Sequence, residues 1–168
     1  MMSEFDDVLQ DGQEESESIE QKHLTFCIGE EDYGIPISHV IEIIGIQPIT
    51  DLPEVPQWIK GVINLRGRVI PVMDIRLRFK IDEREYDDRT CIIVASMNGE
   101  NVGLIVDSVK EVVDVDPEQV TQPPAVSGSA SNQYIMGLGM MGERVVILLD
   151  TGKLLFGEEL KVVKEAAA

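Results

Sequence analysis

The chain has 168 residues and a net charge of −17, with 43% hydrophobic and only 5% aromatic residues. This length suits one domain or two small fused ones. The strong negative charge disfavours nucleic acid and bare anionic membranes as partners, because both would be repelled. The many Val and Ile residues favour β-strands, since β-branched side chains fit a pleated surface.

Neither a targeting signal nor a membrane span is expected. The first 19 residues are acidic where a secretory signal is basic and then apolar. Apolar runs stay well short of the ~18 residues that a membrane helix needs. We therefore expect a soluble cytoplasmic protein that does not insert into the membrane. Cys27 and Cys91 lie in apolar runs without CxxC spacing, which favours buried free thiols, although their number would also permit a disulfide.

The first part of the chain alternates short apolar runs with turns. Residues 1–21 are acidic and without periodicity, as in a disordered tail. Residues 23–28 and 33–36 are expected to form a hairpin, followed by a tight turn at 38–40 and a strand at 41–46. Residues 47–57 contain three prolines and predict a loop.

The segment 59–79, IKGVINLRGRVIPVMDIRLRF, joins a glycine-containing turn to an apolar strand at 69–74 and ends near Phe79. Six of the 14 basic residues of this acidic protein cluster between positions 60 and 80. This positive zone is either a solvated strand face or a docking surface, and the sequence leaves both open. Its members are Lys60, Arg66, Arg68, Arg76, Arg78 and Lys80.

The second part of the chain follows the same order. Residues 80–89 are charged and predict a linker, and 90–96 and 101–106 predict a second hairpin. A Pro/Ser/Gly-rich loop at 116–131 precedes a third hairpin at 134–149. Residues 150–156 and 158–168 predict a C-terminal helical segment.

Matching residues at two constant spacings show that the chain contains an internal repeat. At an offset of 76 residues, Gly61 corresponds to Gly137 and Asp74 to Asp150. At an offset of 69, Val40 corresponds to Val109. An insertion in the proline loops accounts for the difference of seven residues, because surface loops tolerate length changes.

The repeat predicts a mainly all-β fold of two barrel-like halves, each of about five short strands, with short helices including one at the C-terminus. Closure into small barrels would also remove open sheet edges. The expected divisions are 1–21 for the acidic tail, 22–84 and 85–156 for the two halves, and 157–168 for the helical segment. Whether strands exchange between the halves is left open.

Catalytic and metal-binding chemistry is not supported. Asp74 and Asp150 occupy equivalent repeat positions, which favours a structural role at strand ends over acid–base catalysis. His23 and Cys27 have the spacing of one strand face, but a second pair of ligands for zinc is missing. We find no nucleophile elbow and no phosphate loop. We therefore expect no enzyme activity, no metal and no cofactor.

Glu42 and Arg66 each interrupt an apolar run. Such charges are costly unless paired or exposed, so we expect either a salt bridge that braces the turn near Arg66 or two independent solvated groups. Ile46 and Ile49, on either side of Pro48, are either loop anchors or part of an exposed apolar patch.

Four ordered blocks carry a resemblance to a known family: YGIPISHVIEII, WIKGVINLRGRVIPVMDIRLRF, GLIVDSVKEVV and IMGLGMMGERVVILLD. Together they resemble the CheW family of chemotaxis coupling proteins, over about residues 23–156. The resemblance implies two SH3-like barrels and a non-catalytic adaptor. Its implied partners are the cytoplasmic tip of methyl-accepting chemotaxis receptors and the regulatory domain of the chemotaxis histidine kinase. It implies a cytoplasmic protein recruited to membrane-associated receptor arrays.

On matching positions, the resemblance implies a receptor-binding groove between the barrels and a separate kinase-binding surface. The receptor set is Val40, Glu42, Arg66, Val109 and Val112. The kinase set is Ile46, Ile49 and Leu52. Two alternatives remain open: a coupling protein of a chemosensory system that does not control swimming, and a small acidic enzyme using the cleft between the barrels.

Overall fold

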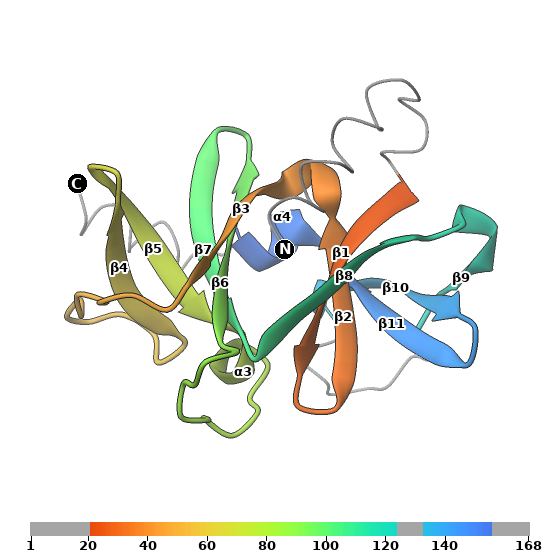
Figure 1. Cartoon of the computed structure of the whole chain (residues 1–168), viewed down its shortest axis with the longest axis horizontal. Coiled ribbons are helices and arrows are strands. Elements are labelled where there is room, and N and C mark those ends of the chain that lie inside the picture. The colour runs from red at the N-terminus through yellow and green to blue at the C-terminus, as the bar shows by residue number, and fades with distance from the viewer. Residues whose placement is uncertain (1–20, 124–132, 156–168) are drawn as a thin grey trace.

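A computed structural model describes residues 21–123 and 133–155. The described part of the chain is built mainly from strands, which confirms the mainly all-β prediction (Figure 1). The strands are β1 (Lys22–Ile28), β2 (Glu31–Pro36), β3 (Val40–Gly45), β4 (Ile59–Leu65), β5 (Arg68–Asp74), β6 (Cys91–Met97), β7 (Glu100–Val106), β8 (Ser108–Asp114), β9 (Val120–Thr121), β10 (Ile135–Met141) and β11 (Arg144–Leu149). The short helices are η1 (Ile37–His39), α3 (Ile75–Arg78), η2 (Pro117–Gln119) and α4 (Thr151–Leu155).

The strands form two sheets, each of which takes strands from both halves of the sequence. One sheet has the order β8-β1-β2-β11-β10-β9, and the other has the order β3-β6-β7-β5-β4. The hairpin β1–β2 of the first half therefore pairs with β8 and β11 of the second half. The hairpin β6–β7 of the second half pairs with β3 and β5 of the first half. Strand exchange occurs, and the sheets do not follow the expected boundary between residues 84 and 85. We call the six-stranded unit barrel A and the five-stranded unit barrel B.

The pairing registers reproduce the 69-residue repeat. Phe26 pairs with Val109 in barrel A, and their counterparts Ala95 and Val40 pair in barrel B. Both ladders contain a register shift close to these pairs, and such bulges bend a strand and re-aim its side chains. The two barrels are thus copies at the level of individual backbone pairs.

The repeated glycines have a shared steric reason. An ideal Cβ on Gly61 would lie 2.0 Å from the carbonyl oxygen of Thr50, and one on Gly137 would lie 2.5 Å from a methyl group of Val120. Next to each glycine, a short segment pairs with the strand. Thr50 forms a bridge to Val62 of β4 in barrel B, and β9 pairs with β10 in barrel A. Only glycine lets two backbones approach this closely.

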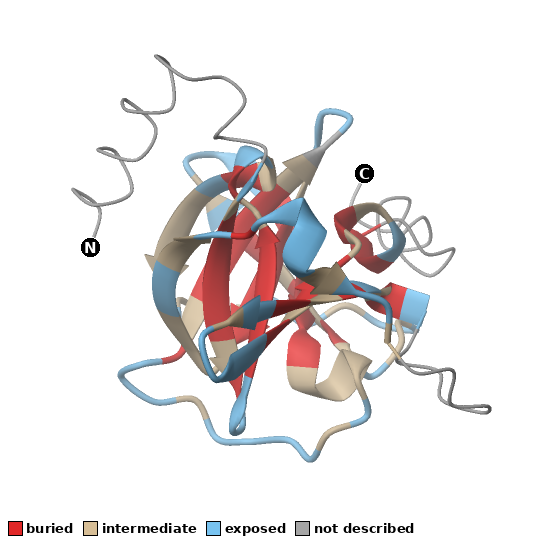
Figure 2. Cartoon of the chain, turned by 90° about the vertical axis from the view of Figure 1, so that its right-hand side faces the viewer, coloured by how far each residue is buried: buried red, intermediate tan, exposed pale blue. Residues whose placement is uncertain are grey.

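Three apolar clusters stabilise the fold. Barrel B encloses one around Ile63, Val72 and Ile92, and barrel A encloses a smaller one of Val115, Val146 and Leu148. The largest lies between the barrels and takes side chains from both sheets, among them Phe26 and Leu104. Figure 2 shows the buried residues on strands at the centre of the molecule and the exposed ones on the outer loops. This shared core stabilises the pair of barrels together, because burial of each large aliphatic side chain contributes about 1.5–3 kcal/mol.

The remaining predictions of elements differ in detail. After Asp74 the chain turns into α3, and the linker 80–89 contains neither a helix nor a strand. Helix α4 confirms helical structure within 151–155. The prediction of a loop throughout 116–131 was wrong at its start, where η2 and β9 form. Residues 1–20 of the acidic tail, residues 124–131 of that loop and the C-terminal segment from residue 156 lie outside the described residues. Both cysteines are free and only partly buried. Among the described residues, no helix has the length and apolarity to cross a membrane.

Candidate functional site: the face formed by β3, β8 and the Arg66 turn

Arg66 lies in a two-residue turn that joins β4 to β5. Its φ is 53° and that of Gly67 is 84°, so both residues are left-handed, as a tight hairpin with primed geometry requires. The Asn64 side-chain oxygen accepts a hydrogen bond from the Gly67 N–H at 2.8 Å and fixes the turn. A left-handed non-glycine residue is strained, and such strain concentrates at functional positions.

The Arg66 guanidinium reaches across to Glu42 on β3. Its Nη1 and Nη2 donate to Oε1 and Oε2 of Glu42 at 2.6 and 2.8 Å, which is the bidentate geometry that gives arginine–carboxylate pairs their strength and direction. The expected salt bridge is confirmed. Hydrogen bonding from Arg66 lowers the pKa of Glu42, against a smaller opposing effect of burial.

The pair is asymmetric in exposure. The Glu42 side chain is 13% exposed, whereas the Arg66 side chain is 72% exposed. The carboxylate is therefore a shielded anchor, and the guanidinium is presented to solvent with donors left over for a partner, since arginine has five N–H groups.

Barrel A carries a looser version of this pair. Glu111 is the repeat counterpart of Glu42, while Gly142 occupies the position of Arg66. Arg144 approaches Glu111 only to 4.0 Å and makes a closer contact with Asp32, at 3.1 Å. Of these two related sites, only the one in barrel B has a bidentate arginine–glutamate pair.

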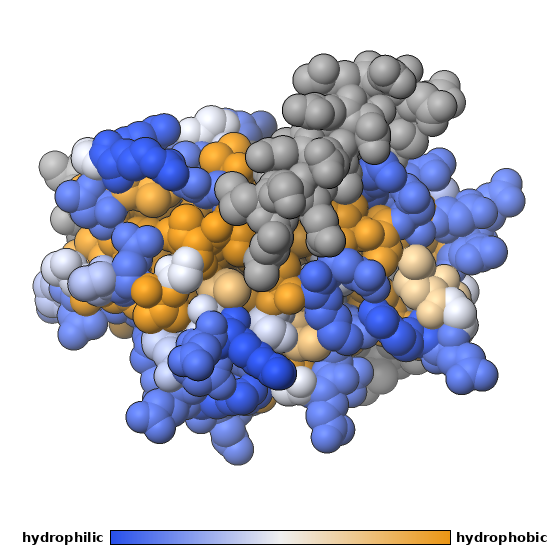
Figure 3. All heavy atoms as spheres, in the orientation of Figure 1, coloured by the Kyte–Doolittle hydropathy of each residue, from blue (hydrophilic) through white to orange (hydrophobic). Residues whose placement is uncertain are grey.

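Partly exposed apolar side chains lie beside Glu42 on β3 and on β8 of barrel A. Ile41 lies where the β3–β6 register shifts, and half of its side-chain surface is exposed. Val109 and Val112 on β8 are partly buried against the shared core. Figure 3 shows apolar side chains in a band over β3, β6 and β8, flanked by hydrophilic ones.

We call this surface the crossover face, because β3 and β8 are the strands that follow each crossing between the barrels. Its members are Ile41, Glu42, Arg66, Val109 and Val112. Four of them belong to the predicted receptor set. The fifth predicted residue, Val40, lies in the shared core and is 7% exposed, so it supports this face from beneath.

The predicted kinase set is divided between three environments. Ile46, which directly follows β3, is 37% exposed. Ile49 packs against the interior of barrel B, and Leu52 packs against the shared core. Of the two readings for the residues around Pro48, loop anchoring describes Ile49, and exposure describes Ile46.

The basic zone is partly neutralised within the chain. Lys60 pairs with Glu83 at 2.5 Å, and Arg76 pairs with Asp107 at 2.6 Å. Together with Arg66, at least three of the six basic groups make internal ion pairs. The zone is therefore not a uniform positive surface, and Arg66 is the member whose geometry favours docking.

The acidic and sulfur groups considered for chemistry have structural partners. Asp74 accepts from the Leu77 N–H, and Asp150 accepts from the Lys153 N–H at 3.0 Å, so both aspartates cap short helices, as their repeat positions indicated. The Cys27 thiol donates to Asp32. Within 21–123 and 133–155, no group of three or more His, Cys, Asp and Glu side chains is placed to hold a metal ion.

Comparison with known proteins agrees with this architecture. Residues 22–159 match the family described as CheW-like domain. The chain belongs to the CheW family. It is 39% identical over 151 residues to the chemotaxis protein CheW of Klebsiella aerogenes, covering 90% of this chain and 91% of that protein. It is 33% identical over 142 residues to CheW of Treponema pallidum, covering 82% and 84%.

A solved CheW structure has the same fold. The scaffolding protein TtCheW from Thermoanaerobacter tengcongensis superimposes with a TM-score of 0.75 at 34% identity, covering 83% of this chain and 94% of that one. The family assignment identifies this chain as a non-catalytic coupling protein of chemotaxis signalling, which acts between chemoreceptors and the kinase. The alternative of a small acidic enzyme is set aside.

Sequence reasoning missed Ile41. The resemblance implied Val40 as a receptor contact, whereas the register shift between Val40 and Glu42 exposes the next residue, Ile41. A bulge of this kind has no strong sequence signal, and the β-branched run of 40–44 indicated only a strand.

Proposed function

We propose that the crossover face binds the cytoplasmic tip of methyl-accepting chemoreceptors, with Glu42, Arg66, Val109 and Val112 as contacts. The observation that carries this proposal is the exposed Arg66 guanidinium, held by a shielded Glu42 beside the half-exposed Ile41. An amphipathic helix docks through a row of aliphatic contacts. A fixed arginine at the edge of such a row would set the register by binding a polar group on the helix.

The kinase regulatory domain would bind at a separate surface next to Ile46. Its 37% exposure makes Ile46 an accessible apolar contact, while the packing of Ile49 and Leu52 would hold the loop that follows β3 in position. Separate, individually modest surfaces suit a scaffold, because two weak contacts in one assembly produce a much higher overall affinity. The protein would then be cytoplasmic and recruited to receptor arrays at the membrane.

Binding experiments test the proposal directly. The full chain is mixed with a receptor cytoplasmic fragment, with the kinase regulatory domain, and with both together. We expect binding to each and a ternary complex. Absence of binding to both partners would overturn the proposal. Receptors of a swimming and of a non-swimming chemosensory system, used side by side, decide which system this chain serves.

Matched variants locate the two surfaces. Arg66→Ala and Ile41→Ser should weaken receptor binding, whereas Arg89→Ala, which removes an equal charge from the exposed linker, and Val145→Ser on β11 should not. Ile46→Ser should weaken kinase binding and leave receptor binding unchanged. Unchanged receptor affinity in both Arg66→Ala and Ile41→Ser would remove the crossover face from the receptor contact.

A further inference from the structure

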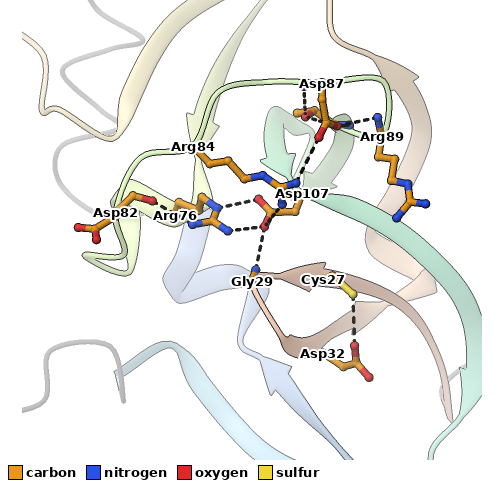
Figure 4. Close-up of polar contacts among 10 residues, drawn as sticks. Cys27, Gly29, Asp32, Arg76, Asp82, Arg84, Asp87, Arg89 and Asp107 are labelled. Atoms are coloured by element: carbon orange, nitrogen blue, oxygen red, sulfur yellow. Dashed lines mark hydrogen bonds and ion pairs between the residues drawn. The ribbon is translucent and has the colours of Figure 1, made fainter.

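The chain passes from barrel B to barrel A between β7 and β8, at Asp107. The Asp107 carboxylate accepts from Arg76 of α3 twice, from Nε at 2.8 Å and from Nη2 at 2.6 Å. It also accepts from the Gly29 N–H in the β1–β2 turn of barrel A at 2.8 Å, and from Arg84 of the linker at 3.3 Å (Figure 4). The Asp107 side chain thus connects a turn of barrel A to helix α3, which follows β5 of barrel B.

This ion pair is shielded from solvent. The side chains of Asp107 and Arg76 are only 10% and 15% exposed. Burial acts to raise the pKa of Asp107, but hydrogen bonds from Arg76 and Gly29, with the charges of Arg76 and Arg84, outweigh it and lower the pKa. Removal of one partner from a shielded pair leaves an uncompensated charge, so such pairs hold their geometry firmly.

The same short helix also contacts both barrels through aromatic rings. The Arg78 guanidinium lies 3.8 Å from the ring centre of Trp58 and 4.6 Å from that of Tyr134. These rings precede β4 of barrel B and β10 of barrel A, and they are repeat counterparts. Phe79, which follows α3, stacks on Tyr134 with ring centres 5.9 Å apart. Helix α3 is therefore attached on both sides of the junction.

The internal repeat shows that these contacts are not needed to build a barrel. At the position equivalent to Asp107, the other crossing between the sheets has the exposed Ser38. In α4, Gly152 and Leu154 stand at the positions of Arg76 and Arg78. The two barrels have equivalent strand pairing, although only one of them carries these charged residues. Arg76, Arg78 and Asp107 are therefore not required for the barrel fold itself.

We propose that Arg76, Arg78 and Asp107 form a clamp, the α3 clamp, that fixes the orientation of the two barrels relative to each other. The barrels share one apolar core, but apolar contacts are non-directional, whereas bidentate ion pairs and stacked cations impose geometry. The clamp is a property of the isolated chain, and its test is independent of any partner.

Inter-barrel distance is the readout. Spin labels are attached through Asp51→Cys, next to the Thr50 bridge to β4, and Glu143→Cys in the turn between β10 and β11. Cys27→Ser and Cys91→Ser remove the native thiols, and pulsed electron resonance gives the distance distribution. Fluorescence of Trp58, which is the only tryptophan in the chain, reports whether Arg78 keeps its place.

Asp107→Asn is the main variant, because asparagine has nearly the same shape but only one acceptor oxygen and no charge. We expect a displaced or broadened distance distribution and altered Trp58 emission. Arg76→Lys keeps the charge but loses the bidentate geometry, so a smaller change in the same direction is expected. Asp114→Asn, which removes the exposed Lys22–Asp114 pair within barrel A, should change neither readout.

A folded Asp107→Asn protein with the wild-type distance distribution would overturn the clamp, even if its stability were reduced. If Asp107→Asn does not fold, Arg76→Lys decides in the same way. A displacement that Asp114→Asn reproduces would also overturn it, because the effect would then be unspecific.

Discussion

The Glu42–Arg66 ion pair connects the two edges of the sheet that forms barrel B. Strands β3 and β4 are the terminal strands in the order β3-β6-β7-β5-β4, and no ladder joins them. The bidentate contact from the β4–β5 turn to β3 therefore spans the open side of the barrel. Ion pairs with an exposed partner contribute little to stability, so the value of this one lies in holding the turn and its arginine in one place.

The first prediction concerns the coupling of this pair. Glu42→Gln and Arg66→Gln, each alone and together, should give a non-additive loss of stability in urea unfolding, with the double variant costing less than the sum. High salt should reduce the coupling, because Arg66 is exposed to screening. Additive effects at low salt would mean that the contact contributes nothing.

The same pair predicts a dependence on acid. The pKa of Glu42 is lowered in the folded chain, so its contribution is fully present above the unfolded pKa and is lost as pH falls through the folded value. The Arg66→Gln variant should show a smaller loss over that range. Identical acid profiles for wild type and variant would contradict the coupling.

The second prediction tests the close approach at Gly61. In Gly61→Ala the new methyl group would meet the Thr50 carbonyl oxygen, and the residue has a φ of 142°. We expect a loss of about 1–3 kcal/mol from overpacking, with backbone strain of similar size in addition, measured by urea unfolding. Gly45→Ala is the matched control, since its Cβ would meet nothing within 4 Å. Equal stability of the two variants would contradict the steric account.

The sequence predicted the architecture because the duplication is visible in it. Equivalent residues such as Val40 and Val109 were found by spacing alone, and their backbone pairs are equivalent in the fold. The exchange of hairpins between barrels could not be predicted, because a repeat has the same local pattern whether it pairs within itself or with its copy. The Arg76–Asp107 contact was missed for a related reason, since it joins segments 31 residues apart that only the exchange brings together.

The candidate site was predicted in part. The pairing of Glu42 with Arg66 was foreseen from two charges in apolar runs, because an unpaired charge there would be costly. The exposure of Ile41 depends on a bulge, and the burial of Val40 depends on the neighbouring barrel, so neither follows from local periodicity. The roles of these residues in binding stay predictions.

The third prediction concerns Tyr86, in the linker that joins the sequence halves. Its hydroxyl donates to Oδ2 of Asp74 at 2.8 Å, and Asp74 is almost fully buried at the start of α3. Burial, with the nearby Asp74 carboxylate, raises the pKa of Tyr86 strongly. Tyr86→Phe removes a donor from a buried charge and should cost about 1–3 kcal/mol in urea unfolding.

A double-variant comparison separates this bond from general packing of the ring. In an Asp74→Asn background, Tyr86→Phe should cost less, because the acceptor is no longer charged. The same cost in both backgrounds would show that the loss comes from the ring and not from the hydrogen bond.

The fourth prediction concerns His23 on β1. The residue is 6% exposed, and Nδ1 lies 3.1 Å from the Gln21 carbonyl oxygen, so the neutral ring carries its proton there. Nε2 is buried and has no hydrogen-bond partner among the described residues. Burial lowers the pKa of His23, a hydrogen bond to Gln21 opposes this, and the nearby His39 adds to the lowering.

The sign of the effect follows from these shifts. With a folded pKa below the unfolded value of 6.5, the unfolded chain binds more protons in between, and the free energy of unfolding falls as pH is lowered through this range. Urea unfolding between about pH 7.5 and 5.5, a range that spans the ordinary histidine pKa, should therefore show a loss that is smaller in His23→Gln. The variant is compared with wild type at each pH, so that carboxylate titrations common to both cancel. Parallel stability profiles for the two proteins would show that His23 does not couple protonation to folding.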